Sequence, residues 1–191
     1  MRNSSFSARQ LADHLLFPGP FDDALASGVF VQVHSNEESA QLFWDLAPML
    51  EAGGTFVVVI DAVHLMVEDG LQRLVHLLRE RCGMESAPDS GRDELTLADA
   101  LANIMRLQSR TVVLLLGGAQ RLPAEPGERV MKAIKAARDC VNLEPASTGR
   151  FLLVATWILP ANPSKYVENS CSAFYGATAV TLAPGGAGIA N

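Results

Sequence analysis

The stretch Thr111-Val112-Val113-Leu114-Leu115-Leu116-Gly117-Gly118-Ala119-Gln120-Arg121-Leu122 decides the fold. Its first six residues form an almost uninterrupted apolar run, which is typical of a strand covered on both faces of a parallel sheet. Two glycines follow directly, so the chain is expected to turn where the strand ends. Ligands of open α/β sheets bind at the carboxyl ends of the strands, and here two successive positions carry no side chain.

Similar apolar runs recur along the chain and alternate with amphipathic stretches. The strands are predicted at 28–33, 55–60, 111–116, 150–155 and 177–182, and the helices at 7–16, 40–51, 65–82, 96–107 and 127–142, with a short helix after Pro163. This alternation predicts an α/β fold with a doubly wound, mainly parallel five-stranded sheet and helices on both faces. Residues 1–184 are expected to form a single domain, and residues 185–191 a flexible tail.

Composition excludes several classes of protein. The chain has 191 residues, of which 49% are hydrophobic and 19% charged, as expected of a globular protein rather than a disordered one. The net charge of −6 argues against direct binding of nucleic acid as a general function of the surface. No run reaches the roughly 18 apolar residues of a membrane span, and the first residues do not resemble a signal peptide.

The three cysteines, Cys82, Cys140 and Cys171, lie far apart and in no metal-binding spacing. They are interpreted as reduced, mostly buried thiols, and no metal site is predicted from them. Together with the missing signal peptide, this spacing predicts a cytoplasmic protein.

Several strings resemble a bacterial family of small AAA+/STAND-like ATP-binding proteins with a P-loop core. These strings are Gly117-Gly118-Ala119-Gln120, the helical segment Met131–Asn142, the strand Phe151–Thr156 and the segment Ala173–Ala177. The resemblance covers roughly residues 28–184. It implies a P-loop NTPase-like core with ATP and Mg²⁺ as the family's ligands.

The residues that carry ATP hydrolysis in that family are replaced here. The P-loop pattern G-x-x-x-x-G-K-[ST] aligns with Gln32–Ser39, in which Gln32 and Glu37 stand for the glycines and Glu38 for the lysine. The strand 111–116 should end in Asp-Glu, which orient Mg²⁺ and polarise water, but Gly117 and Gly118 stand there. The polar residue of the sensor strand, Thr156, leads into an apolar stretch, and the chain is expected to lack a helical lid.

These losses predict a catalytically inactive, ATPase-like protein that acts as a protein-interaction or regulatory module. The partner is expected to be a protein, either an active AAA+ ATPase or a second copy, with Arg121 or Arg129 serving a neighbour. No cofactor is expected. A further hypothesis is that the chain is a fragment of a larger, disrupted reading frame.

The alternative is a nucleotide- or metal-binding protein with a non-standard site. Ser39, Asp61, Gln120 and Thr156 would then surround a ligand at the carboxyl edge of the sheet, and only then would ATP and Mg²⁺ bind. Asp61 could also cap the following helix, with His34 and His64 lying in solvent and holding no metal.

Two other features have a functional and a structural interpretation. The cations Arg129, Lys132, Lys135 and Arg138 recur every third residue and form either a phosphate-binding stripe or an ordinary solvated helix face. Trp157 and Phe174-Tyr175 form either an exposed apolar contact or part of the core.

Overall fold

The computed structural model describes residues 5–17, 28–83, 96–108, 111–122, 125–143, 149–158, 174–175 and 177–182. Six parallel strands form one sheet in the order β1-β6-β2-β5-β4-β3. The strands are β1 (Ser5–Phe6), β2 (Val29–Val33), β3 (Phe56–Asp61), β4 (Val112–Gly117), β5 (Phe151–Ile158) and β6 (Thr178–Leu182). The central strands are apolar at nearly every position, as expected for a sheet that is covered on both faces.

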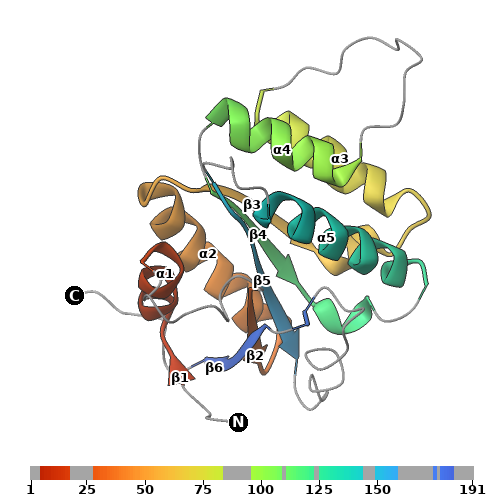
Figure 1. Ribbon diagram of the computed structural model, residues 1–191. Coiled ribbons are helices and arrows are strands. Elements are labelled where there is room, and N and C mark those ends of the chain that lie inside the picture. Colours follow the sequence, from red (N-terminus) through yellow and green to blue (C-terminus); the bar gives the residue numbers. More distant parts are fainter. Residues whose placement is uncertain are drawn as a thin grey trace.

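Helices cover both faces of this sheet (Figure 1). Helices α1 (Ala8–Leu16) and α2 (Asn36–Ala52) lie on one face, and α3 (Gly70–Arg81), α4 (Leu97–Gln108) and α5 (Gly127–Asn142) lie on the other. Two short 3₁₀ helices, η2 (Ala62–Leu65) and η3 (Ala119–Arg121), follow the ends of β3 and β4. The predicted fold class, a doubly wound α/β sheet, is therefore confirmed.

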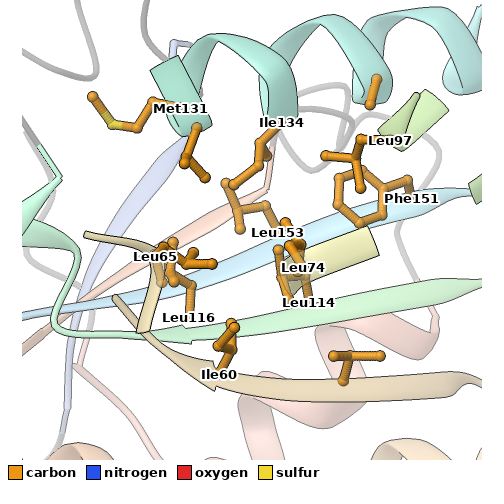
Figure 2. Packing of buried hydrophobic residues seen from close by; sticks show 14 of the residues in the cluster. Ile60, Leu65, Leu74, Leu97, Leu114, Leu116, Met131, Ile134, Phe151 and Leu153 are labelled. Atoms are coloured by element: carbon orange, nitrogen blue, oxygen red, sulfur yellow. The ribbon is translucent and has the colours of Figure 1, made fainter. Parts of the chain in front are cut away.

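The larger core lies between the sheet and helices α3, α4 and α5. Figure 2 shows Leu153 of β5 pointing toward Ile134 of α5, with Leu114 and Leu116 of β4 in the same cluster. All four side chains are buried. Because each buried leucine or isoleucine contributes roughly 1.5–3 kcal/mol, this layer fixes the strands whose ends carry the candidate site.

The sheet contains one strand that the sequence does not predict. Ser5 and Phe6 pair with Thr181 and Leu182 and extend the sheet by the two-residue strand β1. Such a short segment carries no detectable alternation, so only its pairing with β6 reveals it.

Local capping signals place two helices correctly. Ser7 and Gln10 form a capping box at the start of α1, and Thr96 and Asp99 bond reciprocally at the start of α4. The helix predicted at 65–82 begins later in the structure, at Gly70, because η2 and a turn precede α3. The predicted short helix after Pro163 and the tail at 185–191 lie outside the described residues.

Candidate functional site at the carboxyl edge of the sheet

The connection between β2 and α2 consists of only His34 and Ser35. The Ser35 hydroxyl accepts a hydrogen bond from the Glu38 backbone N–H at 3.1 Å and caps the helix. The prediction that the helix begins at residue 40 is therefore wrong, since α2 starts at Asn36. Two acidic side chains in its first turn favour this early start, because they face the positive end of the helix dipole.

Because α2 starts early, the segment that aligns with a P-loop lies partly in β2 and partly in α2. Gln32 lies in β2, where its Oε1 accepts a hydrogen bond from the Thr181 hydroxyl at 3.3 Å. Glu37, Glu38 and Ser39 all lie in the first turn of α2. No glycine-rich loop separates the strand from the helix in this described part of the chain, so the backbone has no slack with which to wrap a phosphate chain.

Glu38 folds back over the turn that precedes its own helix. Its Oε2 accepts a hydrogen bond from the backbone N–H of His34 at 2.5 Å and lies 3.1 Å from His34 Nδ1. The carboxylate therefore occupies a backbone donor at the start of α2, the kind of group that binds anions in P-loop proteins. Glu37 is also acidic here, because hydrogen bonds from the Ser35 side chain and from its own backbone lower its pKa.

Ser39 and Thr156 meet beneath this turn. Their hydroxyl oxygens lie 2.6 Å apart, and the Thr156 oxygen also accepts the Gly118 backbone N–H at 3.2 Å. Thr156 is fully buried and Ser39 is 5% exposed. The two hydroxyls that could have bound a phosphate or a water therefore hold β5, α2 and the end of β4 together.

Asp61, at the end of β3, is bound by two protein donors. Its Oδ1 accepts the Val63 backbone N–H at 2.8 Å, which caps η2, and the Arg121 Nη1 at 2.8 Å. Asp61 was expected to cap the next helix, and this is confirmed for the short helix η2. Arg121, one of the two arginines expected to serve a neighbour, instead neutralises Asp61 within the same chain.

Gly117, the last residue of β4, and Gly118, which follows it, lie beside this pair. A Cβ atom at Gly117 would lie 3.6 Å from Asp61 Oδ2, so an acidic side chain there would add a second carboxylate beside Asp61. Gly118 has a φ of +65°, which disfavours other residues, and a Cβ there would lie 3.0 Å from Arg121 Nη1. The geometry of this edge thus suits the glycines rather than the missing acids.

The structure brings together some of the residues predicted for an alternative ligand site. Ser39 and Thr156 form one pair, and Asp61 belongs to the ion pair with Arg121. Gln120 turns to β5, where its Oε1 accepts the Ile158 backbone N–H at 3.4 Å. All four predicted residues lie at the carboxyl edge, but each already has a protein partner.

The described residues contain no cluster of three or more His, Cys, Asp or Glu side chains that could hold a metal ion. His34 bonds to Glu38, and His64 is exposed in η2. Cys140 is an exposed free thiol, which corrects the expectation of a buried one, and Cys82 is partly buried. Burial raises the pKa of the Cys82 thiol, so it stays protonated at neutral pH.

The basic residues of α5 are paired with acids of the same helix region. Arg129 binds Glu125 at 3.0 Å, Lys132 binds Glu128 at 2.7 Å, and Lys135 binds Asp139. Arg138 is 4% exposed and bonds to Asp139 as well. These pairs favour the interpretation of an ordinary solvated helix face for Arg129, Lys132 and Lys135, whereas the buried Arg138 does not belong to that face. The pairing also occupies Arg129, the other arginine expected to serve a neighbour.

Trp157, Phe174 and Tyr175 are predicted to form either an exposed contact or part of the core, and the structure separates them. Trp157 and Phe174 are buried and pack on Phe30, with ring centroids 5.2 Å apart in both pairs, whereas Tyr175 is 45% exposed. Trp44, which the sequence analysis did not single out, is 78% exposed. Its position next to Asp45, on the polar side of α2, is the signal that could have identified it.

Trp44 borders a groove of about 510 Å³ between α2 and the outer strand β3. The groove is mostly apolar, and it reaches Asp61 and Gly117 at the carboxyl edge. It is lined by Ala40, Phe43, Trp44, Ala47, Val59 and Ile60 among others. This apolar groove adjoins the candidate site directly through Ser39, Asp61 and Gly117, which also line it.

Comparison with protein-family models finds no match to this chain, and comparison with curated proteins finds none either. Among the described helices, none combines the length and the apolar character needed to cross a membrane. A proposal of function therefore rests on the geometry of the carboxyl edge and of the groove beside it.

Proposed function

We propose that the chain is a catalytically inactive, ATPase-like protein that acts in the cytoplasm as a protein-interaction or regulatory module. The observation that carries this proposal is the two-residue connection of His34 and Ser35 between β2 and α2. A P-loop binds phosphate through a glycine-rich loop of backbone N–H groups and a lysine. Here the loop is missing, and the Glu38 carboxylate occupies the His34 N–H.

The residues at the ends of β3 and β4 do not fit ATP with Mg²⁺. Hydrolysis needs one acid that holds the hydrated metal and a second group that orients the attacking water. Gly117 and Gly118 supply neither, and the carboxylate of Asp61 is neutralised by Arg121 at 2.8 Å. No step of nucleotide hydrolysis is therefore assigned to these residues.

The exposed apolar groove supports an interaction role. Trp44 and Val59 are 78% and 44% exposed, although both are large apolar residues beside the core. Monomeric proteins rarely expose large contiguous apolar patches, and such patches often mark sites of protein association. The proposed partner is a protein, either an active ATPase of the AAA+ class or a second copy of the chain.

A thermal-shift titration with ATP, ADP and a non-hydrolysable analogue, with and without Mg²⁺, tests the proposal. We expect no change in melting temperature at millimolar nucleotide. A ligand that binds the folded state at a hundred times its Kd would stabilise that state by about 2.7 kcal/mol, which such a titration detects easily. The variant Glu38→Lys is the matched control, because it restores the missing cation but leaves the two-residue turn unchanged.

Glu38→Lys should also show no response, since the backbone and not only the charge is unsuited to phosphate. A saturable, Mg²⁺-dependent rise in melting temperature of the unaltered chain would contradict the proposal. If Asp61→Asn also abolished that rise, the function would become nucleotide binding at the non-standard site of Ser39, Asp61, Gln120 and Thr156.

A further inference from the structure

Strand β3 ends the sheet on one side within the described part of the chain. Phe56 donates its backbone N–H to the Thr111 carbonyl at 2.8 Å, so Phe56 faces β4. Backbone groups alternate along a strand, and Val57 and Val59 therefore turn their N–H and C=O groups outward. Arg81 donates Nη2 to the Val57 carbonyl at 3.5 Å, a long bond that protects the edge only at its start.

The middle of this edge is apolar on the side of α2. Val57 is buried beneath the helix, whereas Val59, two residues further on the same face, is 44% exposed. Trp44 of α2 lies beside it along the groove and is 78% exposed. An open strand edge with an apolar flank is a template for pairing with another strand.

The charges at the two ends of the edge indicate which strand fits. Arg81 and Glu51 lie 3.7 Å apart at the start of β3, and Asp61 and Arg121 lie 2.8 Å apart at its end. An antiparallel copy of the same edge would bring Arg81 to the partner's Asp61 and Glu51 to the partner's Arg121. The edge is therefore complementary in charge to itself, which is the requirement of a two-fold symmetric interface.

We propose that two copies of this chain associate by antiparallel pairing of their β3 strands, with Val59 opposite the partner's Val59. In this register the two valines exchange both backbone hydrogen bonds, and Val57 lies opposite the partner's Asp61. The two-fold axis is perpendicular to the sheet, so both α2 helices lie on the same face. Trp44 and the partner's Trp44 then cover the central valine pair.

This inference rests on the proposed function as an interaction module and names a second copy as the partner. Arg81 exchanges its long bond to the Val57 carbonyl for the carboxylate of the partner's Asp61. Both bonds that Asp61 makes to described residues use Oδ1, so Oδ2, which faces Gly117 in the single chain, is free of them and turns to the outer edge to receive the partner's Arg81. The register thus satisfies the outward groups of β3 without breaking the Asp61–Arg121 pair.

Sedimentation velocity of the full chain, from micromolar to several hundred micromolar, tests the association. We expect dimers that dissociate on dilution. Val59→Lys should give a folded monomer over the whole range, because the symmetry places identical positive charges opposite each other. Leu143→Lys is the matched control, since Leu143 is 79% exposed at the end of α5, and this variant should dimerise like the unaltered chain. Circular dichroism and the urea midpoint show whether each variant is folded.

Amide hydrogen exchange gives a second readout that specifies the register. The Val59 N–H should exchange slowly in the dimer and quickly on dilution, whereas the Phe56 N–H, bonded inside the sheet, should be protected in both states. A chain that stays monomeric throughout, a dimer that survives in folded Val59→Lys, or rapid exchange of Val59 in the dimer would each overturn the inference. If the chain is monomeric and its melting temperature does not change with nucleotide, only this inference is overturned. If its melting temperature rises with nucleotide and Mg²⁺, the proposed function is overturned, whatever the oligomeric state.

Discussion

Thr156 is the residue on whose hydroxyl group the candidate site depends most. It contacts the Ser39 hydroxyl at 2.6 Å and accepts the Gly118 N–H at 3.2 Å, and it has no contact with solvent. A buried hydrogen bond adds little net stability, but a buried group that loses its partner is costly. In this protein the polar residues of the carboxyl edge serve the packing of the sheet.

Thr156→Val should lower the free energy of unfolding by about 1–3 kcal/mol, because it leaves the Ser39 hydroxyl and the Gly118 N–H without a partner. Ser39→Ala removes one of these groups. In the double variant, the added loss caused by Thr156→Val should therefore be smaller than in the unaltered chain. Urea denaturation of the four chains measures this coupling. Strictly additive losses would show that the two hydroxyls do not interact.

At the scale of single elements, α2 shows what the sequence can and cannot predict. The capping boxes of α1 and α4 are local patterns, so the starts of those helices are predicted correctly. The sequence predicts that α2 begins only at residue 40, because the polar segment Asn36–Ser39 is equally suited to a loop and to the first turn of a helix. The Ser35 cap and the return of Glu38 to His34 decide between the two.

The candidate site is less predictable than the strands that position it. Asp61 and Arg121 lie 60 residues apart, and only the parallel register of β3 and β4 brings their ends together. The sequence places Asp61 at a strand end but gives no partner for it. Likewise, the groove that Trp44 borders lies beside β3, and the place of β3 at the edge of the sheet depends on the order of all the strands.

Helix α5 offers a test by pH. Burial opposes ionisation of Asp139, but hydrogen bonds and positive charge from Lys135 and Arg138 prevail and lower its pKa below the ordinary 3.8. The resulting stabilisation is complete above pH 3.8 and is lost as the pH falls through the lowered pKa. Asp139→Asn should therefore cost about 1–2 kcal/mol at pH 7, a range reduced for the partial exposure of the carboxylate.

Urea denaturation of Asp139→Asn and of the unaltered chain between pH 7 and pH 2.5 measures this difference. The difference should shrink below pH 4, because the protonated carboxyl no longer attracts Arg138. Glu128→Gln is the control, since its partner Lys132 is largely exposed and such pairs contribute about 0–1 kcal/mol. A difference for Asp139→Asn that is constant with pH would exclude the ionic origin of the stabilisation.

At the scale of the whole molecule, the order of the strands makes the sheet depend on its last element. Strand β6 lies between β1 and β2 and pairs with both. Removing it would strip β1 of its only strand partner within the described structure and expose one edge of β2. The apolar residues Val29 and Val31 of β2 would then lie beside an open edge.

A chain that ends at residue 176 should therefore fail to fold cooperatively. We expect its urea titration, followed by circular dichroism, to show a broad and shallow change in place of a single transition. A chain that ends at residue 182 keeps β6 and serves as the control. Cooperative unfolding of the shorter chain, with the midpoint of the control, would show that β6 is dispensable.

The position of β2 also has a consequence for how the protein is made. Its two neighbours, β5 and β6, follow β3 and β4 in the chain, so Val29–Val33 has no strand partner while residues 34–150 are being synthesised. At about 5–20 residues per second, that interval is on the order of ten seconds. During this time the apolar segment Val29–Val33 is available to chaperones or to other nascent chains. Synthesis is thus a stage at which this strand is exposed to aggregation.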